Sequence, residues 1–573
     1  MVRAILLHAY QREFSPLTGE GTDHQRGKNS ENTVSSPARG DRTEDWVREI
    51  MGKYLLKRIL YGVVSIIIVV AIVMVMIYSL LNRDLVFSND SAFTRQSSNA
   101  QVIYKYGKWE QFGYLDYVTY QEWLNVIAAN GEIDEETRTE AMNLGRKPES
   151  DSDTVAKYVA QFTEYYESQG YTVTRLNAVT SGRKVITGGQ QALFAAKDLP
   201  LLGRIWDYFT GIVDIDNIHK AAEVEGERGL TFTLFDPLYG GNQFAPAIIG
   251  NGTEHKYLLY FDSQFPFIHQ NFATIQLGTS YSVNQGVDVA DTMSVSQGAY
   301  VLKPITFPTG FQENSADDLH TAVYRQGSRE ALEMNTVRFN DDYTVVNTIK
   351  GGFSKLGYSF IIGILASIMA YCLGLPLGVL MALKKDTIVD TLGKLYTVFI
   401  IAVPSLAYIF IFKGIGGAVF KLPTTFDMES TSKLIFVLPI VSLALPSIAN
   451  LMKWLRRYMV DQMNSDYVKF ARSGGLSEGE IFSKHILKNA AIPIVHGIPG
   501  AILTAMVGAI ITERVYVVPG AGNLLTEAIN KYDNGVIVGV TLFYAVLSVA
   551  SIILGDILMA TVDPRISFTT KDR

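Results

Sequence analysis

The feature that most limits what this chain can fold into is a run of apolar residues near its N-terminus. Ile59–Leu81 contains no charged residue, and Arg58 stands directly before it. At about 1.5 Å per residue, a helix of this length crosses the ~30 Å hydrocarbon core of a bilayer. The run is longer than a signal-peptide core and lacks a small-residue cleavage site. We therefore expect it to be retained as a membrane span within residues 51–84.

Five further apolar stretches follow a long polar segment. They cover roughly Leu356–Leu383, Leu392–Phe412, Leu434–Ile448, Ile494–Val518 and Val536–Val562. The chain is therefore predicted to be an α-helical polytopic membrane protein with six spans, five of them in a core at 351–573. The only cysteine, Cys372, falls inside the second span, so the rest of the chain must fold without an internal disulfide.

Basic residues cluster beside alternate ends of these spans. They precede the first span and follow the second, fourth and sixth, namely Lys53, Lys57, Arg58, Lys384, Lys385, Lys394, Lys453, Arg456, Arg457, Arg565, Lys571 and Arg573. The positive-inside rule places all of them in the cytoplasm together with both termini. Residues 85–350 then lie outside the cell, and we assign the chain's net charge of −6 to that segment.

The outer segment combines helical and strand patterns, which predicts a compact α+β domain. Helices are expected over Thr119–Ala129, Asp134–Leu144 and Asp153–Gly170, and strands over Tyr171–Leu176, Leu230–Phe235, Tyr257–Phe261, Ala299–Pro304 and Thr344–Ile349. We interpret the aromatic residues of 257–272 as core, because a domain without disulfides needs aromatic burial. Contact with a ligand or partner is the alternative.

Residues 1–50 have a different character. Gln25–Thr43 is polar and rich in Gly, Ser and Asn, a composition typical of disorder. Met51 begins a basic segment that leads directly into the first span. We expect 1–50 to be a disordered extension and Met51 to be the true initiator. N-terminal sequencing of the native protein that found Met1 would refute this hypothesis.

A polar island, Asp466–Pro493, lies between the fourth and fifth spans, within the basic segment 453–493. Its pattern predicts two short helices joined by a tight turn on the membrane surface. The first ends at Gly474-Gly475, which supplies a left-handed residue. A capping box at Ser477 and Glu480 starts the second, which is expected to run over 477–487.

The island can serve as a docking element, or it can be an amphipathic loop whose cations face lipid phosphates. For docking, Arg472 and Lys484 are the candidate polar contacts. The full set of candidate docking residues is Ala471, Arg472, Gly474, Gly475, Leu476, Ser477, Glu480 and Lys484.

Prolines and ionisable residues inside the spans mark candidate helix breaks and path positions. Breaks are tolerated in a membrane where neighbouring helices or a cavity satisfy the freed backbone groups, although ordinary bundle packing is the alternative. The candidates are Pro376, Pro404, Pro439, Pro446, Pro499 and Glu513. For Glu513, Arg514 and Asp556 there are two interpretations, a functional role and a structural role in pairing at helix ends.

The island DYVKFARSGGLSEGEIFSKHILKNAAIPIV resembles the cytoplasmic EAA loop of permease subunits in ABC importers, in particular their oligopeptide/dipeptide branch. MGKYLLKRIL, LGLPLGVLMALKK, ITERVYVVPGAGNLLTEAI and DPRI agree with that branch in the same order. The likeness covers about 51–85 and 270–570. It departs at Lys469 and Phe470, where the family pattern has an acidic and a small residue. The outer segment is also enlarged by an insertion at about 95–270.

The resemblance implies a type I importer permease in the plasma membrane of a Gram-positive bacterium. It also implies a second homologous permease, two ATPase subunits that use ATP and Mg, an extracellular lipid-anchored peptide-binding protein and a peptide substrate. The inserted domain is expected to dock the binding protein; a path-lining or structural role is the alternative. A dipeptide or nickel permease, and a receptor with an outer sensing domain, are the alternative functions.

The sequence contains no G-x-x-x-x-G-K-[ST] phosphate loop, so the chain is not its own ATPase of that type. No metal-ligand cluster and no nucleophile–base pair stands out either. We therefore expect no catalytic residue, no metal site, no bound cofactor and no nucleic-acid partner, with membrane lipid as the surroundings of the core.

Overall fold

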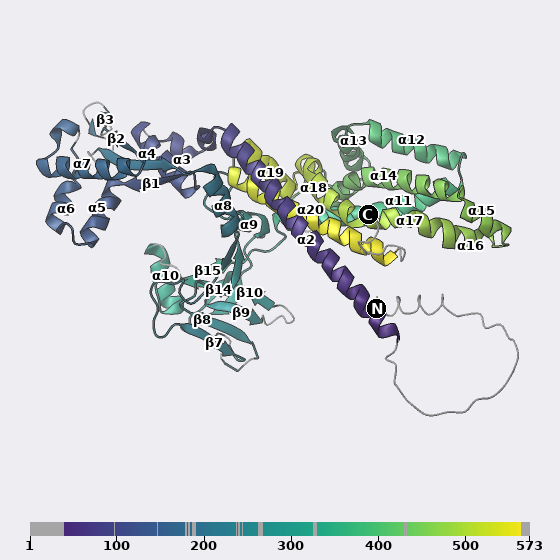
Figure 1. The fold of residues 1–573 in the computed structure, drawn as a ribbon, viewed down its shortest axis with the longest axis horizontal. Helices are drawn as coiled ribbons and strands as arrows, with labels where there is room; N and C mark the ends of the chain where they lie inside the picture. The colour runs from purple at the N-terminus through teal and green to yellow at the C-terminus, as the bar shows by residue number, and fades with distance from the viewer. Residues whose placement is uncertain are drawn as a thin grey trace, which may run out of the picture. The chain divides into compact units, whose positions relative to one another are not determined.

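The computed structural model describes residues 39–562, except 97, 146, 178–179, 182–183, 186–190, 237, 239–240, 243, 262–267, 325–328, 429 and 431. Within these residues five helices are long and apolar enough to cross a membrane, and a bent pair adds a sixth if it is counted as one span. The five lie in α2 (Arg39–Leu80), α11 (Lys355–Leu383), α14 (Val437–Met463) with the preceding turn η4 (Lys433–Phe436), α18 (Ile498–Tyr516) and α20 (Asn534–Val562) (Figure 1). The predicted polytopic helical fold is confirmed.

Helix α2 begins earlier than the sequence predicts. Residues 39–50 form its first turns, whereas disorder is expected up to residue 50. Extending an existing helix avoids the cost of nucleation. Residues 1–38, and with them most of the predicted extension, lie outside the described residues.

The predicted span Leu392–Phe412 is a bent pair of helices. Helices α12 (Ile388–Ala402) and α13 (Ser405–Ala418) meet at an angle of 113°. Val403 has a ψ of 130°, as expected for a residue before proline. Pro404, which has no N–H to donate, stands at the N-cap of α13. The break predicted at Pro404 is therefore present, and it is sharp enough to turn the chain.

The other prolines do not interrupt their helices. Pro376 lies inside α11 and Pro446 inside α14, and both helices continue through them. Pro439 stands in the first turn of α14, and Pro499 stands in the first turn of α18. A first turn has no intrahelical acceptor for its N–H groups, so proline is tolerated there.

Glycines on α11 bring this helix close to α14. A Cβ on Gly374 would lie 3.0 Å from the Cβ of Leu451, and one on Gly378 would lie 3.2 Å from the Cα of Met452. Small residues four apart allow membrane helices to approach in this way. The segment around Pro376 therefore serves as a helix–helix contact surface.

The segment between α2 and α11, where the sequence predicts an α+β domain, contains two groups of elements built on separate sheets, which we call the first and second lobes. The first lobe has a sheet in the order β1-β5-β2, in which both outer strands pair antiparallel with β5. Its elements are η1 (Arg83–Phe87), α3 (Ser91–Thr94), α4 (Ser98–Gln111), β1 (Leu115–Thr119), α5 (Tyr120–Ala129), α6 (Glu135–Ala141), η2 (Pro148–Ser150), α7 (Asp153–Ser168), β2 (Thr172–Leu176), β3 (Thr180–Ser181), β4 (Lys184–Val185) and β5 (Ala192–Asp198). The predicted helices correspond to α5, α6 and α7.

The second lobe has a sheet in the order β10-β9-β8-β7 and two two-stranded sheets, β12-β13 and β14-β15. Its elements are β7 (Gly229–Thr233), β8 (Ala247–Asn251), β9 (Tyr257–Phe261), β10 (Ile268–Gln270), β12 (Lys303–Thr306), β13 (Gln312–Ser315), β14 (Asp317–Tyr324), α10 (Arg329–Phe339) and β15 (Thr344–Thr348). Between the lobes and the core lie α8 (Leu201–Gly211), the ribbon of β6 (Val213–Ile215) and β11 (Ala273–Ile275), and α9 (Val289–Ser294). The predicted strand Ala299–Pro304 begins only at Lys303.

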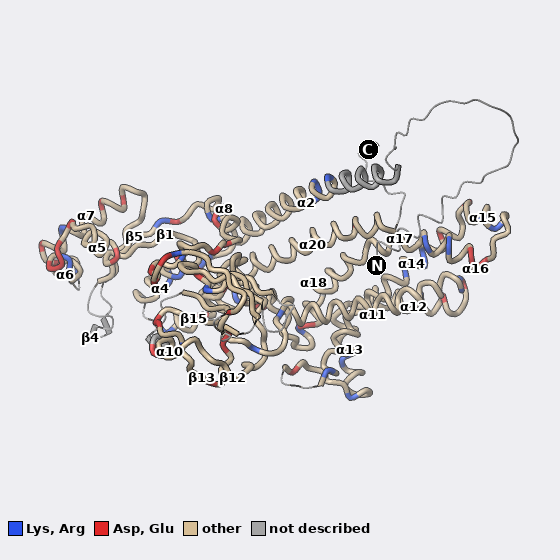
Figure 2. The backbone as a smooth tube through the Cα atoms, turned by 90° about the horizontal axis from the view of Figure 1, so that it is seen from below, with Lys and Arg blue, Asp and Glu red and all other residues tan. Residues whose placement is uncertain are grey.

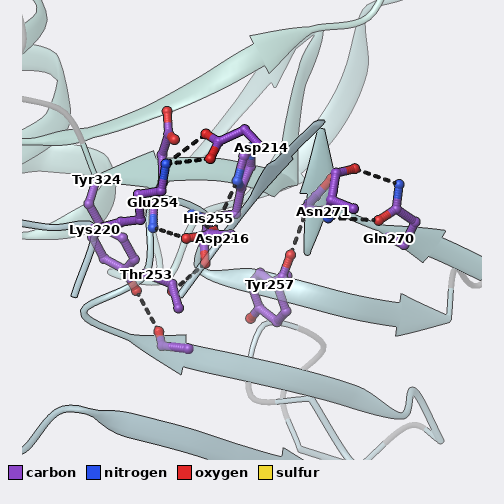
Figure 3. A network of polar contacts seen from close by, with 12 residues as sticks. Asp214, Asp216, Lys220, Thr253, Glu254, His255, Tyr257, Gln270, Asn271 and Tyr324 are labelled. Carbon is purple, nitrogen blue, oxygen red and sulfur yellow. Dashed lines mark hydrogen bonds and ion pairs between the residues drawn. The ribbon is translucent and has the colours of Figure 1, made fainter. Parts of the chain in front are cut away.

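Polar contacts hold the loops of the second lobe. The Asp216 carboxylate accepts the backbone N–H groups of Glu254 and His255, each at 2.8 Å (Figure 3). The core interpretation of the aromatic residues is confirmed for Tyr257 and Tyr260, which are buried. By contrast Phe272 is 49% exposed, and Phe265 and Phe267 lie outside the described residues.

Candidate functional site

The polar island follows α14 and is helical on both sides of one turn. It consists of α15 (Asp466–Ser473), α16 (Glu478–Glu480), the π-helical segment η5 (Ile481–Leu487) and α17 (Lys488–His496). The two predicted helices and their turn are present. The second helix differs from the prediction in two ways, because it continues to His496 and is π-helical over η5. Such wider turns often occur at functional sites.

Backbone geometry holds the turn between α15 and α16. Gly475 has a φ of +82°, in the left-handed region that favours glycine. The N–H of Leu476 donates to the carbonyl of Ala471 at 3.4 Å, and the N–H of Gly475 donates to that of Arg472 at 3.1 Å. These two bonds form a Schellman motif, with Gly474 at the C-cap.

The predicted capping box starts the second helix. The Ser477 hydroxyl accepts the N–H of Glu480 at 3.3 Å, and the Glu480 carboxylate accepts the N–H of Ser477 at 3.2 Å. Two backbone donors at the helix start are thereby satisfied. The direction in which the helix leaves the turn is thus set by residues within the turn.

One face of the island is buried against the membrane core. Its apolar side chains form one cluster with α14 and the end of α11, whose members are Ala382, Leu455, Met459, Val468, Ala471, Ile481, Ile486, Ala490 and Ile494. Leu476 packs against the same cluster, as the C-terminal turn predicts. Val468, Ile481 and Met459 are each 0% exposed. The island and α14 therefore share one close-packed cluster.

The other face of the island is exposed and charged, and Figure 2 shows basic residues along α14 and α15. Phe470 is 82% exposed. Arg472 Nε donates to Glu478 Oε1 at 2.7 Å, and Lys484 Nζ lies 3.4 Å from Glu480 Oε1. The Arg472 guanidinium lowers the pKa of the Glu478 carboxyl. Both candidate docking cations are therefore accessible, but each already pairs with a carboxylate of the island.

Glu513 is fully buried within the helical core. Ser359 Oγ of α11 donates to Glu513 Oε1 at 2.6 Å, and the N–H of Asn523 donates to Oε2 at 3.0 Å. Asn523 lies in the first turn of α19 (Ala521–Asn530), where the helix dipole favours a negative charge. A Cβ on Gly520 would lie 2.3 Å from the Glu513 carboxyl carbon. This arrangement supports the pairing role over a place on an open path.

The other intramembrane charges have separate surroundings. Arg58 Nε donates to Asp556 Oδ2 at 3.0 Å and so joins α2 to α20. Arg514, in contrast, is exposed. Among the described residues no group of three or more His, Cys, Asp or Glu side chains has the arrangement of a metal site.

A buried aspartate that the sequence analysis missed connects the outer segment to the core. Asp533 lies between α19 and α20 and accepts the hydroxyl of Ser280 at 2.7 Å. It also accepts the N–H groups of Tyr281, Ser282 and Val283, at 2.9, 2.9 and 2.8 Å. An aspartate directly before an apolar run is a helix N-cap signal, but that signal does not reveal such distant partners.

Comparisons with known proteins place this arrangement in a family. Residues 374–568 match the family model described as "Binding-protein-dependent transport system inner membrane component". The chain is 32% identical over 527 residues to the "Oligopeptide transport system permease protein AmiC" of Streptococcus pneumoniae, which covers 91% of this chain and 99% of that protein. The chain belongs to the oligopeptide ABC transporter permeases.

Other relatives match a smaller part of this permease. The "Dipeptide transport system permease protein DppB" of Bacillus subtilis is 32% identical over 216 residues, 37% of this chain and 68% of that protein. A solved structure of the MetNI methionine ABC transporter in inward-facing conformations covers 36% of this chain and 93% of that chain, at 14% identity. Its TM-score of 0.30 is too low to inform the arrangement of the helices.

Family membership settles the general role of the chain. It is a multi-pass membrane permease subunit, a transport component that catalyses no reaction and binds no cofactor. Because the transport system is binding-protein-dependent, ATPase and binding-protein subunits work with it.

Proposed function

We propose that this permease imports oligopeptides and forms one half of their path, while a second homologous permease forms the other half. It is similar over almost its whole length to an oligopeptide permease, whereas the similarity to a dipeptide permease covers 37% of the chain. The longer match includes the enlarged outer segment. Two ATPase subunits supply the energy, and an extracellular lipid-anchored binding protein delivers the peptide.

The proposed orientation has both termini in the cytoplasm and residues 85–350 outside the cell. In this orientation the basic residues of α14 and α15 face the cytoplasm, as the positive-inside rule requires. The two outer lobes then lie on the side from which peptide arrives, where we assign them the docking of the binding protein. The path runs between the two permeases, so its lining is shared.

The division of the polar island into a buried and an exposed face carries this proposal. Phe470 and Arg472 are accessible to a partner, whereas Val468 and Ile481 are locked against α14. When ATP brings the ATPase subunits together, the island follows the subunit that holds it. The packed cluster passes this displacement to α14 and α11, so the helix bundle changes between inward-open and outward-open states.

Docking can be tested by placing a charge on the exposed face alone. Phe470→Asp should reduce co-purification of the ATPase subunits and abolish peptide uptake, while the permease remains inserted. Phe420→Asp is the matched control, because Phe420 is 68% exposed but lies outside the island. Retention of the ATPase subunits by the Phe470→Asp variant at the wild-type level would refute the docking role.

The cargo can be tested separately with labelled peptides of graded length. We expect uptake to extend beyond dipeptides and to require the binding protein. Uptake confined to dipeptides, or uptake of nickel in place of peptides, would overturn the assignment of oligopeptides as the substrate. The docking proposal would stay intact.

A further inference from the structure

A groove of about 610 Å³ lies between α12 and α14, near the end of α14 that leads to the polar island. Its lining combines apolar and basic side chains. Val398 and Ile401 belong to α12, and Lys453, Arg456 and Arg457 belong to α14. Neither the docking of an ATPase nor the pairing of Glu513 uses this groove.

Two basic side chains at the groove are ordered by one buried carboxylate. Asp390, which is 0% exposed, accepts Nε and a terminal nitrogen of Arg456 at 2.6 and 2.7 Å. Lys394 Nζ lies 2.8 Å from the same carboxylate. Bidentate pairing of this kind fixes the guanidinium plane. Asp390 therefore positions both cations, and Asp386 adds a second carboxylate 3.7 Å from Lys394 Nζ.

Two further cations have no such partner. In the described part of the chain neither Lys453 nor Arg457 forms an ion pair, and both lie over the ring of Trp454, at 5.7 and 5.4 Å from its centroid. Asp461 also lines the groove. Asp386, Asp390 and Asp461 are three carboxylates against four cations, so one positive charge remains in excess.

The basic and apolar parts lie at different heights along α12. Lys394 and Ile401 are separated by about 10 Å along the helix axis at ~1.5 Å per residue. The side chains of Val398 and Ile401 are 63% and 60% exposed, so they present hydrocarbon surface beside the basic end. A ligand that fills the groove must therefore carry an anionic group at one end and an apolar chain at the other.

We propose that this groove binds an anionic phospholipid of the inner leaflet. Its phosphate lies against Lys453 and Arg457, and one acyl chain follows Val398 and Ile401. A free phosphate would make no contact with the apolar wall, and a zwitterionic lipid would not match the excess charge. Basic pockets between membrane helices on the cytoplasmic side recognise such headgroups. The assignment of a leaflet rests on the orientation proposed above.

The test uses the assembled transporter in nanodiscs that contain equal amounts of phosphatidylglycerol and phosphatidylcholine. Native mass spectrometry then identifies the lipid that each complex retains. We expect the wild type to retain phosphatidylglycerol preferentially and Lys453→Gln/Arg457→Gln to bind it roughly twenty-five-fold more weakly, from about fivefold for each cation. Lys384→Gln/Lys385→Gln removes the same charge from the end of α11, outside the groove, and should retain the preference.

Three outcomes would overturn the proposal. An equal loss in both double variants would show general surface attraction in place of a site. Displacement of the lipid by glycerol phosphate, with no effect of Ile401→Glu, would assign the groove to a free phosphate. Cross-linking of Val398→Cys, in a Cys372→Ser background, to the second permease and not to a photoactivatable phosphatidylglycerol would make the groove a subunit interface. Because retained lipid is measured, failure here is distinct from failure of ATPase docking or peptide uptake.

Discussion

Single buried carboxylates join parts of this permease that are far apart in the chain, and Glu513 gives the first prediction. Glu513→Ala removes the acceptor of Ser359 and of the N–H of Asn523. We expect a loss of about 3 kcal/mol in stability, because buried donors are left without partners. Thermal unfolding of the purified permease, followed by tryptophan fluorescence, measures it.

Two further variants separate this effect from a general loss of negative charge. Glu513→Gln keeps one acceptor oxygen and should recover part of the lost stability. Glu527→Gln, on the surface of α19, breaks an i,i+4 pair with Lys531 and should cost about 0.5 kcal/mol or less. A melting curve of Glu513→Ala that overlays the wild type would contradict the pairing role.

Asp533 gives a prediction about the junction between the outer segment and the core. Asp533→Asn replaces an oxygen that accepts backbone N–H groups with an amide donor, which faces donors of the loop Ser280–Val283. We expect faster hydrogen exchange in that loop, with the lobes still folded. Asp342→Asn alters an exposed aspartate and should leave exchange unchanged. Unchanged exchange in Asp533→Asn would show that packing alone holds the junction.

The residues that the sequence identifies are those whose partners are close in the chain. Ser477 and Glu480 are three positions apart, so their capping box follows from a local pattern. Ser359 and Glu513 are 154 positions apart, and Ser280 and Asp533 are 253 apart. Intramembrane charge marks Glu513 as unusual, but it does not choose between a path and a pairing role. That choice depends on tertiary contacts.

At the scale of elements, the turn of the polar island provides a paired glycine test. Gly475→Ala places a side chain at a φ of +82° and should destabilise the turn by about 1 kcal/mol. Gly479→Ala replaces a helical glycine with open space around it and should stabilise α16 by about 0.5–1 kcal/mol. Hydrogen exchange over 466–487 should change in opposite directions in the two variants. Changes in the same direction would show that backbone conformation does not govern the turn.

Composition predicts where helices exist better than how they end or bend. Six apolar stretches indicate the membrane elements, because a segment inside the bilayer must be apolar and must satisfy its own backbone hydrogen bonds. The same rule does not distinguish the continuous α11 from the bent pair α12–α13, since both contain proline. The difference depends on position and packing. Pro376 stands between glycines that contact α14, whereas Pro404 begins a new helix. The π-helical turn η5 has no local sequence signal.

At the scale of the whole molecule, the orientation gives a prediction that one labelling experiment checks. Cys372 is the only cysteine, so a Cys372→Ser background allows single cysteines to be placed at will. An impermeant maleimide should label Asp342→Cys in intact cells. It should label Lys469→Cys only after the membrane is opened. Labelling of both residues in intact cells would contradict the proposed orientation.

The two-lobed outer segment could not be predicted as such from the sequence. Helix and strand patterns gave α7 and β9 at nearly their observed bounds, because their periodicity is regular. The separation into two sheets depends on which strands pair, and β5 joins β1 and β2 across long stretches of chain. A single sequence carries little information on such distant pairing.

The length of α14 has a mechanical consequence. Its 27 residues extend without interruption, through Pro446, to Met463, just before the polar island. At ~1.5 Å per residue this is a lever about 40 Å long, so a tilt of about 10° displaces its far end by about 7 Å. Gly374 and Gly378 allow α11 to pack closely against α14. In the proposed docking arrangement, a small displacement of the polar island by an ATPase subunit would be amplified at the opposite end of α14.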